Sequence, residues 1–107
     1  MAVDETDLTA FLLGRSKSYQ LVLHIVPGPA SDVKESKTFS FLPNFRTEIL
    51  FRDLVLLPHS KKLIFFSEDQ LSEIDLQDYP FSNGEVPTIK VYDVHGTVTV
   101  DGFADEP

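Results

Sequence analysis

Three histidines, at positions 24, 59 and 95, carry the imidazole nitrogens that could bind a metal ion. No two of them have the i, i+4 or His-x-His spacing that places two imidazoles on one metal ion. His59 and His95 fall in predicted turns, and His24 falls on the polar face of a predicted strand. We therefore expect solvated histidines and no metal site.

Four lysines in two close pairs are the candidates for contact with an anionic surface. They are Lys34, Lys37, Lys61 and Lys62. At about 1 kcal/mol for each basic residue near an anionic membrane, they would provide a weak, salt-sensitive attraction. The competing interpretation is that these lysines only keep the surface soluble.

The chain offers no recognisable catalytic motif. Carboxylates are abundant, but none stands beside a nucleophile or a base in a known pattern, and the five glycines are scattered singly. The absence of cysteine excludes disulfides, thiol nucleophiles and Cys-ligated zinc. The sequence predicts a protein that is not an enzyme and that needs no cofactor.

The length of 107 residues predicts a single domain over 1–107. The net charge of −8 is uneven, because residues 1–62 carry eight Lys/Arg against seven Asp/Glu, and residues 63–107 carry one against ten. An acidic surface repels phosphate backbones, so nucleic-acid binding is not expected. The acidic N-terminus and the lack of an apolar run of roughly 20 residues favour a soluble, cytoplasmic protein.

Apolar and polar residues alternate with a period near two along much of the chain, which is typical of strands. The predicted strands are 19–26, 39–41, 47–57 and 62–67, followed by a hairpin of 88–92 and 97–101 that points Ile89, Val91, Val98 and Val100 inward. Residues 68–78 fit either a helical turn or a short edge strand. Two packed antiparallel sheets, a β-sandwich spanning 19–101, are the predicted fold.

The segment 4–13 predicts a short N-terminal helix. Its apolar residues fall at i, i+3 and i+4 (Leu8, Phe11 and Leu12). Asp4 or Thr6 would cap this helix, and its apolar stripe would cover an open end of a sheet.

Turn-forming residues surround one aromatic side chain near the C-terminal end of the chain. Residues 80–87 hold Phe81 and Asn83 between two prolines, and Asn83-Gly84 marks a turn. We interpret Phe81 and Asn83 as candidates for an exposed protein contact. The alternative is that Phe81 fills the core.

Three stretches share an order and an approximate spacing that resemble a known family. They are Pro-Asn-Phe-Arg-Thr-Glu-Ile-Leu-Phe at 43–51, Leu-Pro-His-Ser-Lys-Lys-Leu-Ile-Phe at 57–65, and Glu-Ile-Asp-Leu-Gln-Asp-Tyr at 73–79, followed by Gly84 and Ile-Lys-Val-Tyr at 89–92. Together they resemble the C2 domains of the phosphoinositide 3-kinase family. Phe45 stands where that family usually has Trp, the segment before Phe39 is shorter, and the predicted helix is not part of the pattern.

The resemblance implies a C2-like sandwich that works without calcium. C2 folds often bind calcium through aspartates of the loops at one end, and Asp32 and Asp69 are the candidates here, but Leu71 stands where a second aspartate is usual. Calcium takes six to eight oxygen ligands, so these acids alone do not build a site.

A second resemblance points to thioredoxin-like domains. Val86-Pro87-Thr88-Ile89 before the hairpin is similar to their cis-proline strand, and Pro27-Gly28-Pro29-Ala30 lies where their Cys-Gly-Pro-Cys would lie. Without cysteine this would be a redox-inactive chaperone or substrate-binding domain with an α/β fold.

The sequence therefore predicts a non-catalytic module that docks proteins, as a scaffold or adaptor, through loop tips or an exposed sheet edge. One alternative is a peripheral membrane module that uses the four lysines. The other is the redox-inactive thioredoxin-like domain.

Overall fold

A computed structural model describes residues 1–15, 21–41, 54–67, 70–93 and 96–104. These residues form nine strands and no helix. The strands are β1 (Ala2–Val3), β2 (Ala10–Arg15), β3 (Leu21–Val26), β4 (Lys37–Phe41), β5 (Val55–Leu57), β6 (Lys62–Ser67), β7 (Gln70–Asp75), β8 (Thr88–Asp93) and β9 (Gly96–Ala104).

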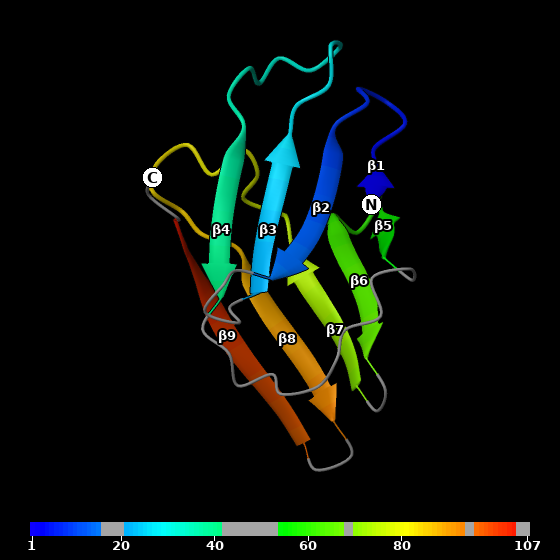
Figure 1. Ribbon diagram of the computed structural model, residues 1–107, viewed down its shortest axis with the longest axis vertical. Helices are drawn as coiled ribbons and strands as arrows, with labels where there is room; N and C mark the ends of the chain where they lie inside the picture. Colours follow the sequence, from blue (N-terminus) through cyan, green and yellow to red (C-terminus); the bar gives the residue numbers. More distant parts are fainter. Residues whose placement is uncertain (16–20, 42–53, 68–69, 94–95, 105–107) are drawn as a thin grey trace.

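The nine strands form one antiparallel sheet in the order β1-β2-β3-β4-β9-β8-β7-β6-β5. The sheet curls into a nearly closed barrel, in which the two edge strands β1 and β5 lie side by side (Figure 1), and their Cα atoms come within 8 Å of each other. Every pair of neighbours is antiparallel, so strand directions alternate along this order. With nine strands, β1 and β5 must therefore run in the same direction.

Strand β9 connects the two halves of the sheet. Its first part pairs with β8, from Gly96 opposite Asp93 to Asp101 opposite Thr88, and its last three residues pair with β4. The prediction of all-β structure is confirmed. The finer prediction of two separate sheets is wrong, because hydrogen bonding through β9 makes the sheet continuous.

Gly102 lies at the point where β9 passes from β8 to β4. It lies opposite Phe41, and its amide donates a hydrogen bond to the Pro87 carbonyl at 2.9 Å. A side chain here would meet the Phe41 ring, since a Cβ would lie 2.8 Å from Cε1. Glycine therefore lets the Phe41 ring pack directly against the backbone of β9.

The core lies inside the curled sheet and follows the period of two. In β3, Leu21, Leu23 and Ile25 are buried, while His24 and Val26 are exposed. The other large side chains that are almost fully buried come from β4, β6, β7 and β8: Phe41, Leu63, Phe65, Ile74 and Ile89. The predicted strands 39–41, 62–67, 88–92 and 97–101 are confirmed, and within 68–78 the residues Gln70–Asp75 form strand β7, which lies between β6 and β8 and not at an edge.

Two expectations about strands need correction. Only the end of the predicted strand 47–57 lies among the described residues, and it forms β5 with three residues. Val98, expected to point into the core, is 49% exposed, although Ile89 and Val91 are buried as expected.

The predicted helix over 4–13 is wrong. Residues 5–7 form a turn and Ala10–Arg15 form strand β2, which pairs with β3 along its whole length. Leu8, expected on the apolar stripe, is exposed at 54%. The alternation in β2 gives the physical reason, because Phe11 and Leu13 face the core on one side of a strand and Leu8 belongs to the preceding loop.

The thioredoxin-like alternative is also wrong for the part of the chain that the structure describes. That fold needs helices on both faces of a central sheet, and these residues contain no helix and no parallel strand pair. Pro27 and Gly28 follow β3 as predicted, but they lead into a loop before β4.

Candidate functional site

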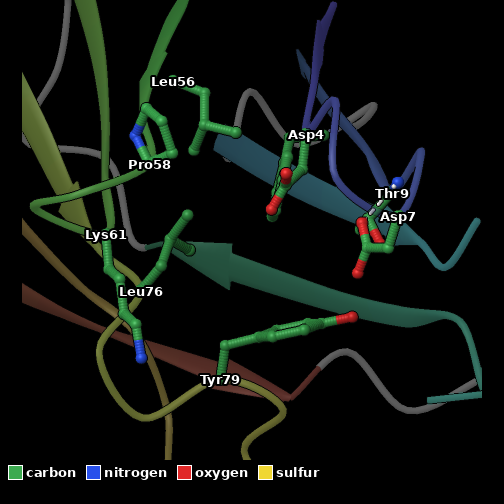
Figure 2. Close-up of a pocket in the computed structure, with 9 residues that line it drawn as sticks. Asp4, Asp7, Thr9, Leu56, Pro58, Lys61, Leu76 and Tyr79 are labelled. Atoms are coloured by element: carbon green, nitrogen blue, oxygen red, sulfur yellow. Dashed lines mark hydrogen bonds between the residues drawn. The ribbon is translucent and has the colours of Figure 1, made fainter. Parts of the chain in front are cut away.

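A pocket of about 130 Å³ opens between the β1–β2 loop, the β5–β6 turn and the loop that follows β7 (Figure 2). Its polar lining consists of Asp4, Asp7, Thr9, Lys61 and Tyr79. Its apolar lining consists of Phe11, Leu56, Pro58 and Leu76. The pocket therefore combines apolar walls with two carboxylates.

Two consecutive Asp-x-Thr turns fix the acidic side of the pocket. Asp4 Oδ1 accepts hydrogen bonds from the amide and the hydroxyl of Thr6, and Asp7 Oδ1 accepts one from the Thr9 amide at 3.0 Å. The backbone closes around them, with the Asp4 amide donating to the Thr9 carbonyl at 2.8 Å. Such turns are a local alternative to a helix, and here they hold both carboxylates in place.

Gly28 supports this loop from the other side. Its amide donates to Thr9 Oγ1 at 3.4 Å, and a Cβ at this position would overlap the backbone of Asp7 and Leu8. The close approach of the two backbones therefore requires glycine.

We expect Gly28→Ala to lower the free energy of unfolding by about 2 kcal/mol, within the range of overpacking costs, because a Cβ would overlap the Asp7 carbonyl oxygen and the backbone of the loop would have to shift. Gly14→Ala is the matched control, since a Cβ there meets nothing within 4 Å. Urea unfolding of both variants checks this. Equal stability of the two variants would contradict the close packing of the loop on Gly28.

Tyr79 closes the inner wall of the pocket. Its ring packs edge-to-face on Phe11 and Phe81, with centroids 6.3 and 6.0 Å apart. Its Oη atom is buried and, among the described residues, has no partner with good hydrogen-bond geometry. Burial raises the pKa of the phenol above 10.0; the nearby Thr9 hydroxyl lowers it, and the charges of Asp7 and Asp4 raise it.

We expect the stability of the protein to fall as the pH rises above about 10, where an unfolded tyrosine loses its proton and folded Tyr79 keeps it. Tyr79→Phe removes this contribution to the pH dependence. Below pH 10 the free energy of unfolding of the variant should equal that of the parent or exceed it by about 1 kcal/mol, because the buried hydroxyl lacks a good hydrogen-bond partner. Urea unfolding at several pH values, with Tyr92→Phe as the control, measures it. If the difference in the free energy of unfolding between the parent and the variant stays constant up to pH 11, this prediction is contradicted.

A groove of about 450 Å³ lies between the two edge strands, next to this pocket. It is lined by Val3 of β1, Leu56 of β5 and the turns that follow each strand: Asp4, Glu5, Thr6, Pro58 and His59. We call this region, together with the facing edges of β1 and β5, the seam. Val3, Val55 and Leu57 point outward along it and are 39%, 46% and 37% exposed.

The facing edges in the seam do not form a ladder. Strand β1 pairs with β2 and β5 pairs with β6, and no pairing joins β1 to β5 within the described ranges. Because β1 and β5 run in the same direction, the seam cannot close as another antiparallel pair. A short exposed edge with apolar side chains is a surface that another strand can extend.

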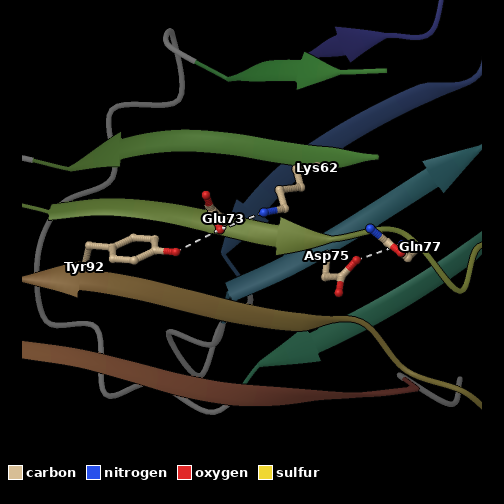
Figure 3. Close-up of polar contacts among 5 residues, drawn as sticks. All are labelled: Lys62, Glu73, Asp75, Gln77 and Tyr92. Carbon is tan, nitrogen blue, oxygen red and sulfur yellow. Dashed lines mark hydrogen bonds and ion pairs between the residues drawn. The ribbon is translucent and has the colours of Figure 1, made fainter. Parts of the chain in front are cut away.

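The outer face of β6–β9 carries a charge-balanced polar cluster (Figure 3). Lys62 Nζ lies 3.6 Å from Glu73 Oε2, and Tyr92 Oη donates to the same oxygen at 3.1 Å. The Lys90 ammonium lies 5.5 Å from the centre of the Tyr92 ring. The Lys62–Glu73 and Tyr92–Glu73 contacts join neighbouring strands, and the Lys90–Tyr92 contact runs along β8, so these polar groups pair with one another, as on many solvated sheet faces.

The predicted contact residues in 80–87 have different environments. Phe81 is 3% exposed and packs on Phe39 at 5.0 Å between centroids, which agrees with the interpretation as a core residue. Asn83 is exposed in the turn that follows. Phe81 is thus unavailable as an exposed contact in this conformation.

The four predicted lysines do not form one patch. Lys61 lines the pocket, Lys62 belongs to the outer cluster, and the Lys37 ammonium donates to the Phe81 carbonyl at 2.9 Å. Lys34 donates to the Ser31 carbonyl at 2.8 Å and lines none of these pockets.

The histidines and loop acids are likewise scattered. The His24 ring nitrogen Nδ1 lies 3.2 Å from Thr38 Oγ1 on the outer face, and His59 is exposed. Asp32 is exposed in the β3–β4 loop, while His95 and Asp69 lie outside the described residues. No three His, Asp or Glu residues gather as a metal cluster in the described part of the chain.

Sequence reasoning missed the pocket and the seam. The one available signal was the repeated Asp-x-Thr in Asp4-Glu5-Thr6-Asp7-Leu8-Thr9, which predicts consecutive side-chain-to-backbone turns. The pocket also contains Tyr79, Leu56 and Lys61, which lie far from this repeat in the sequence. No local spacing therefore predicts that they line the pocket.

The described residues include no helix that is long and apolar enough to cross a membrane. Comparison with known proteins found no matching family model, curated protein or solved structure.

Proposed function

We propose that this protein is a non-catalytic protein-interaction module that docks an extended segment of a partner protein in the seam between β1 and β5. The single observation that carries the proposal is the pair of facing, unpaired strand edges flanked by exposed apolar side chains. Main-chain hydrogen bonds to such an edge provide affinity, and alternate side chains provide specificity.

The direction of the strands suits an added segment. A strand that runs antiparallel to both β1 and β5 would continue the alternation on both sides and make ten strands. Two strand spacings need about 9.6 Å, whereas Cα atoms of β1 and β5 already lie within 8 Å of each other. Strand β1 must therefore move outward by at least about 1.6 Å, and as a two-residue strand it has little pairing to lose.

The polar groups at the pocket support binding more than turnover. One oxygen of each aspartate is held in a backbone turn, and burial raises the pKa of the Tyr79 phenol further above its ordinary value, which disfavours a phenolate. The Asp4 carboxylate contacts the Thr6 hydroxyl, but the same oxygen also accepts the Thr6 amide, as in an ordinary side-chain-to-backbone turn. Kinship with C2 domains and action as a scaffold in the cytoplasm remain predictions.

The membrane alternative has weaker support. Its four lysines do not gather in one place, and three of the ammonium groups contact protein oxygens, at the Ser31 carbonyl, the Phe81 carbonyl and the Glu73 carboxylate. Scattered charges give less attraction to an anionic surface than one basic patch.

Site-specific blocking tests the proposal, since a chain without cysteine can be labelled at one introduced thiol. Val55→Cys lies in the seam, and Val98→Cys is the matched control at similar exposure, 46% against 49%. Random eight-residue peptides are selected on the parent protein by display. Each variant is then labelled with a bulky maleimide, and binding is measured by fluorescence anisotropy.

We expect the selected peptides to bind the labelled Val55→Cys variant about tenfold more weakly, or worse, because the label obstructs the edge of β5. The labelled Val98→Cys variant should bind them like the parent. If no peptide is enriched, or if both labelled variants bind equally well, the proposal fails.

A further inference from the structure

The pocket and the groove of the seam lie side by side. They share three lining residues, Asp4, Leu56 and Pro58. A segment lying in the groove therefore passes the mouth of the pocket, and one of its side chains has a direct path inward.

The interior of the pocket suits a long side chain with a charged end. Leu56, Pro58 and Leu76 line one side of it, and the carboxylates of Asp4 and Asp7 lie across from them, toward the Tyr79 hydroxyl (Figure 2). The side chains of lysine and arginine match these two sides of the pocket, because each has an apolar stem and a cationic tip.

The two carboxylates are held in place, and each keeps one oxygen atom that can accept further hydrogen bonds. Both are half-buried, and in each of them Oδ1 accepts the hydrogen bonds of its Asp-x-Thr turn. Within the described residues, neither Oδ2 atom receives a hydrogen bond or an ion pair. A cation entering the pocket would thus meet two fixed oxygen acceptors, with no ordering cost for the carboxylates.

Lys61 does not neutralise these acids. It lines the pocket, but its ammonium lies on the opposite side from Asp4 and Asp7 in Figure 2, and it forms no ion pair with them. With Glu5 on the groove, the acidic groups outnumber the basic one by three to one.

We infer that the docked segment carries a basic side chain, and that this side chain enters the pocket and pairs with Asp4 and Asp7. The inference rests on the proposed function and names the partner class: an extended, basic peptide segment with apolar flanks that cover Val3, Val55 and Leu57. The net charge of −8 attracts such a segment over a longer range at low salt. A calcium ion fits less well, because two carboxylates fall short of its six to eight ligands.

The probe is a soluble, capped peptide, Ser-Val-Thr-Val-Lys-Val-Thr-Ser, with two matched versions in which norleucine or glutamate replaces the lysine. Norleucine keeps the apolar stem and removes the charge. Binding of each peptide is measured by isothermal titration calorimetry at low and at moderate salt. We expect the lysine peptide to bind about tenfold more tightly than the norleucine peptide, with a preference that shrinks as salt screens the pair.

The protein variants are Asp4→Asn and Asp7→Asn, singly and together. Asparagine keeps the Oδ1 acceptor that each turn uses, so the loop is retained while the charge is removed. Asp101→Asn, an exposed acid on β9, is the control for net charge. The double variant should lose the preference for lysine over norleucine, whereas Asp101→Asn should keep it.

The outcomes separate the two proposals. If the lysine and norleucine peptides bind equally and a label on Val55→Cys blocks both, the basic side chain is refuted and the seam remains a docking site. If the lysine preference persists in the double aspartate variant, the assignment to this pocket is refuted. If neither the three designed peptides nor any selected peptide binds, both proposals are refuted.

Discussion

Replacing Phe41 by alanine is expected to remove about 3–5 kcal/mol from the free energy of unfolding, the range for truncating a fully buried phenylalanine. Phe41 is 0% exposed, at the C-terminal end of β4, and its ring packs on the backbone of β9 at Gly102. The loss is a large share of the roughly 5–15 kcal/mol that stabilises a typical domain. Urea unfolding followed by circular dichroism measures it.

Phe103→Ala is the matched control, because Phe103 is the next residue after Gly102 on the same strand and is 38% exposed. Its truncation should cost less than about 1 kcal/mol. If Phe41→Ala unfolds completely, Phe41→Leu should give a smaller but measurable loss. Similar losses in Phe41→Ala and Phe103→Ala would contradict the placement of Phe41 in the core.

Gly102→Val is expected to cost about 3 kcal/mol, near the upper end for overpacking. Its Cβ would lie 2.8 Å from Phe41 Cε1 and 3.0 Å from the Pro87 carbonyl oxygen, and both belong to the fixed interior of the sheet. Gly14→Val in β2 is the control, since a Cβ there has open space and valine favours strands.

A double-mutant cycle tests the cause of this cost. In a Phe41→Leu background the smaller side chain leaves room, so Gly102→Val should cost at least about 1 kcal/mol less than in the parent, within the usual range for contacting residues. Additive effects would show that the ring of Phe41 does not set the requirement for glycine.

The strands that the sequence predicted well have one face buried and one exposed. In β3 and β6 the alternation is nearly complete, with Leu23 and Phe65 inside and His24 and Phe66 outside. Burial on one face imposes a period of two, and this period is visible in a single sequence.

The prediction of a helix over 4–13 is wrong because two patterns coincide in that segment. Leu8 and Phe11 have helical spacing, yet Phe11 and Leu13 also have strand spacing, and the Asp-x-Thr repeat offers the backbone turns in place of helical bonds. Aspartate and threonine were interpreted as helix caps, a role that uses the same side-chain-to-backbone hydrogen bonds.

The pocket and seam depend on long-range pairing that no local pattern encodes. Strand β9 pairs with β4, more than fifty residues earlier in the chain, and this pairing makes the sheet continuous and leaves β1 and β5 as its edges. Asp4 and Tyr79 meet only because of that closure. Residue types and spacing therefore predicted strands, while the candidate site required the strand order.

Hydrogen exchange read by NMR, with and without the lysine peptide at saturation, tests the docking of an extended segment in the seam most directly. If the segment docks in the seam, we expect slower exchange and shifted amide signals at Val3 and Val55–Leu57, with little change at Glu73 and Tyr92 on the outer face of the sheet. Protection confined to that outer face, or unchanged exchange along β5 when the peptide is bound, would contradict it.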